Sequence, residues 1–122
     1  MRMGWGAAAS PALHDGRLYI VNDNEAKSFL AAYDARTGNE LWRAPREDKS
    51  NWSTPSVWQN SLRTEIVTTS SKKVRSYDTN GNALWELTGM TSIHAATPFA
   101  AGGLLYVSSG YPADSVRLCL RA

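Results

Sequence analysis

Residues 32–42 read AYDARTGNELW, and a shortened form of this stretch returns at residues 76–85 as SYDTNGNALW. The two copies share a Tyr-Asp pair, a glycine and a Leu-Trp pair in the same order. The matching residues lie 43 or 44 positions apart: Asp34 and Asp78, Gly38 and Gly81, and Trp42 and Trp85. Such self-similarity at a fixed period indicates a repeat architecture.

Two further landmarks keep the same period. Ser/Thr-Pro pairs recur with their prolines 44 and 43 residues apart, at Pro11, Pro55 and Pro98. An apolar run that contains a tyrosine skips one copy, since Tyr19 and Tyr106 are 87 residues apart. Three independent landmarks on one period establish an internal repeat.

Each repeat consists of short β-type runs separated by turn residues, without the sustained 3.6-residue apolar spacing of helices. Strands are expected at residues 11–13, 17–21, 29–34 and 40–43, then at 54–58, 64–70, 74–78 and 83–87, and last at 97–99, 104–109 and 116–121. Four short strands in a repeat of about 40–45 residues are typical of a β-propeller blade.

We therefore predict an all-β fold. The chain is expected to form an open arc of antiparallel four-stranded blades, a fragment of a propeller with about seven or eight blades. Two complete blades are expected at residues 1–43 and 44–88, and an incomplete one at 89–122. The runs 18–21 and 104–107 are apolar throughout, which suits blades covered on both faces. An antiparallel sandwich is the alternative fold, and the fixed period argues against it.

The residues between the expected strands are typical of β-hairpin turns. Residues 14–16 and 101–103 contain glycines between the first and second strands, where a positive φ is needed. Asn80-Gly81 predicts a type I′ turn. In the longer first copy, the Asp34 carboxylate is expected to accept backbone N–H bonds, with Gly38 in the left-handed position.

The stretch from Tyr33-Asp34 through Thr37-Gly38 to Leu41-Trp42 resembles the PQQ-like repeat, which closes its third and fourth strands with Asp-x-x-Thr-Gly-x-x-x-Trp. The second copy departs from it, because Asp78-Thr79-Asn80-Gly81 is one residue shorter and has no Thr before its Gly. The family includes quinoprotein dehydrogenases, the propeller lipoprotein of the outer-membrane β-barrel assembly machinery and other envelope proteins. The resemblance is specific for fold and weak for function.

The repeat markers, which are Asp34, Gly38, Trp42, Asp78, Gly81 and Trp85, are interpreted as architecture. Trp42 and Trp85 are expected on equivalent outer strands, mostly buried against a neighbouring blade. Trp52 and His94 lie in blade-linking segments that line one end of the channel in such propellers, so they are the candidates for a ligand role. Residues 22–25, NDNE, are interpreted as a polar loop because they lack the spacing of a calcium loop.

The composition of the chain argues against several classes of function. The net charge is +2 with scattered basic residues, so no stripe for nucleic acid is expected. The longest apolar runs fall short of a membrane span, and no secretory signal is recognised at residues 1–6. The single cysteine, Cys119, excludes an internal disulfide or a multi-cysteine metal site.

Two functions remain open. One is a non-catalytic propeller module that acts as a scaffold or through protein contacts at the cell envelope, in the periplasm, with no cofactor or metal. Its expected partners are the remaining blades and other envelope proteins. The other is a segment of a dehydrogenase, for which the resemblance implies pyrroloquinoline quinone, calcium, a catalytic aspartate and, in several enzymes, adjacent cysteines. The single Cys119, with Asp48 the sole aspartate in the blade links, favours the module.

Overall fold

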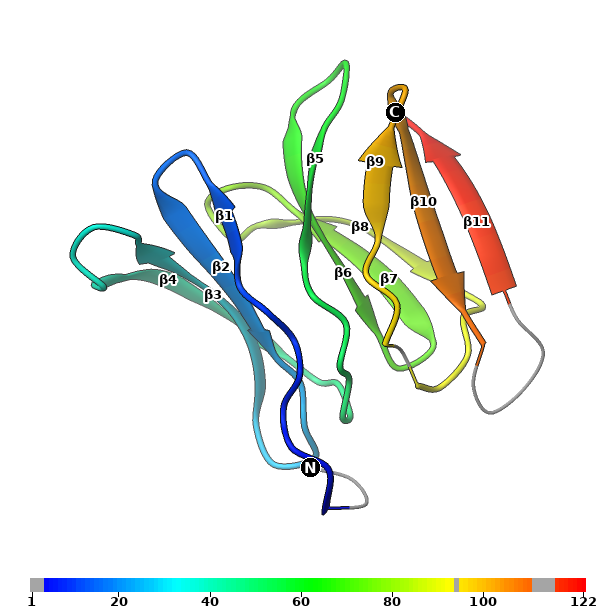
Figure 1. The fold of residues 1–122 in the computed structure, drawn as a ribbon, viewed down its shortest axis with the longest axis horizontal. Helices are drawn as coiled ribbons and strands as arrows, with labels where there is room; N and C mark the ends of the chain where they lie inside the picture. Colours follow the sequence, from blue (N-terminus) through cyan, green and yellow to red (C-terminus); the bar gives the residue numbers. More distant parts are fainter. Residues whose placement is uncertain (1–3, 94, 111–115) are drawn as a thin grey trace.

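The computed structural model describes residues 4–93, 95–110 and 116–122, which form three antiparallel sheets side by side in an open arc (Figure 1). The first blade contains β1 (Ala12–His14), β2 (Arg17–Asn22), β3 (Ser28–Asp34) and β4 (Glu40–Arg46). The second contains β5 (Ser56–Gln59), β6 (Thr64–Ser70), β7 (Lys73–Tyr77) and β8 (Ala83–Thr88). The third contains β9 (Phe99–Ala101), β10 (Leu104–Ser109) and β11 (Val116–Arg121).

In every blade, strands that follow one another in sequence pair antiparallel. The first two sheets have four strands in sequential order, and the third has three among the described residues. This arrangement confirms the all-β propeller-blade architecture. None of the described residues belongs to a helix that is long and apolar enough to cross a membrane.

The first strand of each blade begins later than expected. β1, β5 and β9 start after Pro11, Pro55 and Pro98, whereas the sequence favoured strands at 11–13, 54–58 and 97–99. Proline lacks the N–H that a ladder requires. The Ser/Thr-Pro pairs therefore belong to the links between blades.

The Asn80-Gly81 turn is not type I′, which would need a positive φ at both residues. Gly81 has φ +89°, but Asn80 is not among the residues with positive φ. Instead, the Asp78 carboxylate accepts the N–H groups of Asn80 at 2.8 Å and Asn82 at 2.9 Å. The Asp34 carboxylate accepts the N–H groups of Arg36 and Thr37 in the same way, as expected. The shorter turn thus keeps the aspartate-centred geometry.

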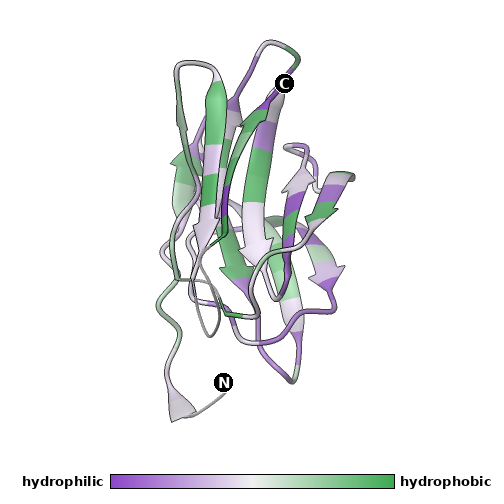
Figure 2. Ribbon diagram, turned by 90° about the vertical axis from the view of Figure 1, so that its right-hand side faces the viewer, coloured by the Kyte–Doolittle hydropathy of each residue, from purple (hydrophilic) through white to green (hydrophobic). Residues whose placement is uncertain are grey.

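Two hydrophobic cores lie between the blades rather than within one sheet. The first core joins Tyr19 and Leu30 of the first blade to Ile66 and Tyr77 of the second. The second core joins Trp58, Val67 and Val74 of the second blade to Leu105 and Val107 of the third. Hydrophobic and hydrophilic bands accordingly alternate along many of the strands in Figure 2.

Among the described residues, those of the middle blade are covered on both faces. Residues 65–70 of β6 are all buried. In β2 and β10, buried residues alternate with more exposed ones along most of the strand. The expected two-sided burial of residues 18–21 and 104–107 is thus found on one face of each run.

Candidate functional site

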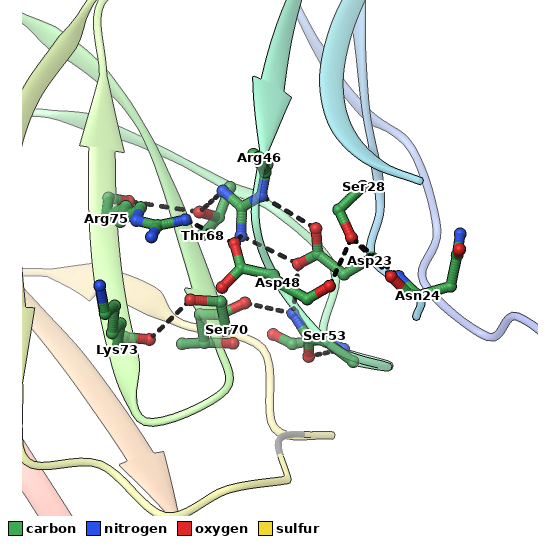
Figure 3. A network of polar contacts seen from close by, with 12 residues as sticks. Asp23, Asn24, Ser28, Arg46, Asp48, Ser53, Thr68, Ser70, Lys73 and Arg75 are labelled. Carbon is green, nitrogen blue, oxygen red and sulfur yellow. Dashed lines mark hydrogen bonds and ion pairs between the residues drawn. The ribbon is translucent and has the colours of Figure 1, made fainter. Parts of the chain in front are cut away.

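The most extensive group of interacting polar side chains lies where the first blade meets the second. We call it the blade-joint network; it comprises Asp23, Arg46, Asp48, Asn51, Thr68, Arg75 and Tyr77. Figure 3 shows Asp23, Arg46, Asp48, Thr68 and Arg75 of this network. Its centre is Arg46, the last residue of β4, whose side chain is completely shielded from solvent. The guanidinium binds both oxygens of Asp23 at 2.9 Å and reaches Asp48 at 3.1 Å.

Arg46 also binds the second blade. It donates to the Thr68 hydroxyl at 2.6 Å and to the Tyr77 hydroxyl at 3.0 Å. Asp48 extends the network, since it accepts from Arg75 at 2.5 Å, and Arg75 in turn binds Glu86 at 2.6 Å. Arg46 thus ties the end of β4 to the middle of the neighbouring sheet.

The network holds paired charges in a low-dielectric setting. Burial raises the pKa of the Asp23 carboxyl, and the guanidinium of Arg46 opposes that effect. The nearby carboxylates of Asp23 and Asp48 keep the pKa of Arg46 above its ordinary value despite burial. Two carboxylates and two guanidiniums alternate, so the buried charge is balanced inside the network.

The polar loop at residues 22–25 supports this joint. Glu25 accepts from the Ser50 backbone N–H at 3.0 Å and from the Ser50 hydroxyl at 2.6 Å. These hydrogen bonds lower the pKa of Glu25 to about 2. The loop therefore anchors the link between β4 and β5 instead of standing free in solvent.

Of the two expected channel-end candidates, Trp52 is described and His94 lies outside the described residues. Trp52 is half-buried and donates its indole N–H to the Gly6 carbonyl at 2.8 Å. Its ring lies 5.4 Å from that of Trp5 with a 59° tilt, and Trp5 is 51% exposed. The aromatic pair presents a solvent-accessible apolar surface at the blade link.

Trp42 makes the clearest contact between repeat markers. It lies on β4, donates to the Thr79 carbonyl at 2.9 Å and packs its ring on Gly81 of the second blade. A Cβ at Gly81 would stand 2.7 Å from the ring. Arg17 donates to the same carbonyl at 2.7 Å.

Trp85 occupies the equivalent outer strand, β8, but bonds differently. Its indole donates to Glu65 of its own blade at 2.7 Å. Glu65 is 1% exposed and also accepts from Asn60, Arg63 and Ser76. As expected, Trp42 and Trp85 lie on equivalent outer strands, and each is largely buried against the core that its blade shares with the next one.

The blade-joint network was not expected from the sequence, which offered only Asp48 as a link aspartate. Asp23 lies in the segment interpreted as a polar loop, and Arg46 lies beyond the expected end of its strand at residue 43. Nothing in the local pattern marks these residues, because their partners are 22 to 31 positions away.

The carboxylates of the blade-joint network do not fit a calcium ion. Asp23 and Asp48 each have an arginine in direct contact, and those guanidiniums occupy the positions that a cation would take. Among the described residues, no group of three or more His, Cys, Asp or Glu side chains is arranged to hold a metal ion.

Comparison with protein-family models identifies the family of the chain. The family model described as outer membrane protein assembly factor BamB, built on the PQQ repeat, matches residues 2–117. A comparison with curated proteins finds no match.

Proposed function

The chain belongs to the PQQ-repeat family of outer membrane protein assembly factor BamB, and on that basis we propose that it is a non-catalytic propeller module. It acts as a scaffold through protein contacts at the periplasmic side of the cell envelope. Its partners are further propeller blades and other envelope proteins.

The observation that supports this proposal is that the buried ionisable groups are bound by other side chains of the fold. Asp23 and Asp48 both bind Arg46 at the blade joint, and Glu65 is surrounded by hydrogen-bond donors from its own blade. Catalytic carboxylates need a pKa and an exposure matched to proton transfer. These carboxylates are engaged by guanidinium groups and other hydrogen-bond donors of the fold, which supports a structural role.

Exposed apolar side chains supply the contact surface that a scaffold needs. The large ones among the described residues are Trp5, Leu13, Leu41, Leu62 and Phe99, with exposed fractions of 47 to 68%. Apolar side chains on rigid strands and hairpins are suited to binding other proteins, since little conformational entropy is lost.

The first experiment tests cofactor binding. The chain is titrated with pyrroloquinoline quinone and calcium, and heat and tryptophan fluorescence are measured. We expect no saturable binding. Stoichiometric micromolar binding that Trp52→Ala or His94→Ala abolishes would overturn the proposal in favour of the dehydrogenase segment.

The second experiment tests protein contacts. A photo-crosslinking amino acid is placed at Leu13, Leu41 or Phe99 in the protein as its own cell makes it, with exposed Glu47 as the matched polar control. We expect adducts with defined envelope proteins from the apolar positions and few from Glu47. Adducts from none of the apolar positions would contradict the scaffold role.

A further inference from the structure

The turn between β7 and β8 contains the one Asn-Gly pair of the chain, Asn80-Gly81. Asn80 is exposed and lies outside the strands. The Asp78 carboxylate binds its backbone N–H at 2.8 Å, but its side-chain amide makes no hydrogen bond to any described residue. The Gly81 N–H reaches the Asp78 carbonyl at 3.2 Å, which is longer than the ordinary distance of about 2.9–3.0 Å. A free side-chain amide therefore stands next to a weakly held backbone nitrogen.

An asparagine side chain can react with the backbone nitrogen of the residue that follows it. Hydroxide removes the proton from that nitrogen, which then forms a bond to the side-chain carbon Cγ. The bond from Cγ to Nδ2 breaks, and the amine takes a proton from water and leaves as ammonia. Water opens the resulting succinimide ring, at Cγ to give aspartate or at the backbone carbonyl to give isoaspartate. The ring closure is intramolecular, and glycine favours it because no Cβ crowds the attack.

Packing between the blades requires the glycine at this position. Trp42 of β4 lies on Gly81, and a Cβ there would stand 2.7 Å from the indole ring. Gly81 also has φ +89°, a conformation that other residues rarely adopt. The contact between the first and second blades therefore keeps, directly after Asn80, the residue that hinders succinimide formation least.

The other asparagines lack this combination, because each is followed by a residue with a side chain. Asn60 and Asn82 also hold their side-chain amides in hydrogen bonds to carboxylates. Asn39 is exposed in the equivalent turn of the first blade, but there the order of the pair is reversed, so Glu40 follows it. Asn39 is thus an internal control for the reaction.

We infer that Asn80 is a site of deamidation, and that its conversion to isoaspartate loosens the joint between the first and second blades. Isoaspartate adds a carbon to the main chain between Thr79 and Gly81. These two residues hold Trp42, since the Thr79 carbonyl accepts its indole N–H at 2.9 Å and Gly81 lies under its ring. A longer main chain cannot keep both contacts in their present places. The modification is independent of the proposed function.

The first experiment measures the reaction itself. The full chain is incubated between about pH 7 and pH 9 and digested, and mass spectrometry with fragmentation that distinguishes isoaspartate from aspartate follows each asparagine. We expect isoaspartate to accumulate faster at residue 80 than at residue 39, at a rate that rises with the hydroxide concentration. The variant Asn80→Ser, which has no amide to lose, should form none at residue 80.

A free peptide of residues 76–85 gives the rate for the same turn without the fold. If residue 80 stays unmodified in the folded chain while the peptide converts, the inference is overturned. Conversion at residue 80 that is no faster than at residue 39 would overturn it as well.

The second experiment tests the effect on the joint. The converted chain carries one more negative charge, so ion-exchange chromatography separates it from the unconverted chain, and NMR compares the two ¹⁵N-labelled forms. We expect the indole N–H resonance of Trp42 to shift. That of Trp85 should stay in place, since it donates to Glu65 in its own blade. The variant Asn80→Asp supplies the charge without the added carbon and should shift the Trp42 resonance less.

Urea unfolding then shows whether the contact with Trp42 accounts for any loss of stability. Conversion should lower the urea midpoint of the chain, and it should lower that of Trp42→Phe less, because the hydrogen bond to Thr79 is already absent there. Equal falls in the two chains, or an unchanged Trp42 resonance in the isoaspartate form, would overturn the proposed effect on the joint.

Discussion

Equivalent tryptophans of the two repeats donate their indole N–H groups to different kinds of acceptor. Trp42 donates to a carbonyl of the next blade, whereas Trp85 donates to the carboxylate of Glu65 in its own blade. Gly81 lies under the ring of Trp42, but nothing lies within 4 Å of a Cβ built on Gly38. The position in the repeat therefore determines the backbone conformation of a residue, whereas the neighbouring blade determines which groups its side chain contacts.

The two glycines offer a matched pair of variants. Gly81→Ala combines a positive φ with a clash against the indole, so we expect a loss of about 2–4 kcal/mol in the free energy of unfolding. Gly38→Ala has φ +76° but open space, and about 1–2 kcal/mol is expected from the backbone alone. Urea unfolding measures both. Equal losses would mean that Trp42 does not press on Gly81.

The tryptophans offer a second pair. Trp85→Phe removes a hydrogen bond to a carboxylate, worth about 1.5–3 kcal/mol. Trp42→Phe removes a hydrogen bond to the neutral Thr79 carbonyl, which still accepts from Arg17, so the lost bond is worth about 0.5–1.5 kcal/mol. We expect the Trp85 variant to be the less stable in thermal unfolding, since the loss of ring area is the same in both. The reverse order would contradict the role assigned to Glu65.

At the scale of elements, the joint between blades depends on one strand end and one loop. β4 continues to Arg46, beyond the expected end at residue 43, and this extension delivers the guanidinium to the second sheet. The loop after β2 supplies Asp23, and the link after β4 supplies Asp48. A polar joint of this kind demands one relative placement of the two blades, because each charge must find its partner.

Arg46→Met tests the joint. It leaves the carboxylate of Asp23 buried without its counter-ion, so we expect a loss of about 3–5 kcal/mol at pH 7. Without Arg46 the pKa of Asp23, already raised by burial, rises further. Ionisation of a group with a raised pKa destabilises the fold as the pH increases through that value. The penalty should therefore shrink as the pH falls from 7 toward the ordinary Asp value of about 4, because protonation of Asp23 removes the unpaired charge.

Arg43→Met is the control, because its ion pair with Glu40 is solvent-exposed at 2.7 Å and such pairs contribute little. Unfolding in urea at several pH values distinguishes the two variants. An Arg46→Met penalty that stays constant between pH 7 and pH 4 would show that the charge of Asp23 is not the cause.

At the scale of the whole molecule, the arc has two outer faces. Leu13 of the first blade is 66% exposed, and Phe99 of the third, stacked on Tyr106, is 58% exposed. The inner joints show that each blade buries an apolar face against its neighbour. Exposed large apolar side chains on these outer faces favour association.

We therefore expect the apparent mass of the chain to rise with concentration in size-exclusion chromatography with light scattering. Leu13→Lys and Phe99→Lys should each reduce the rise. Leu62→Lys, on a hairpin tip of the middle blade, is the control and should leave it unchanged. A strictly monomeric chain with a cooperative melt above about 60 °C would contradict this expectation.

Much of the fold could be predicted because its signals are local. The glycine-containing turns, the short β-type runs and the spacing of Asp34 and Asp78 are properties of consecutive residues, and they identify strands and blades without any knowledge of packing. The prediction of a type I′ turn at Asn80-Gly81 was wrong, because hydrogen bonds to the Asp78 side chain determine the backbone conformation there.

The sequence by itself determined the repeat, the order of the strands and the antiparallel sheets, since these follow from landmarks spaced 43 or 44 residues apart and from turn residues between short β-type runs. Only the tertiary structure decided which charges are buried together. Asp23, Arg46 and Thr68 come from separate strands and loops, and they meet because the blades stack at one distance and angle. That placement depends on how the apolar faces of whole sheets fit together, which no local pattern encodes.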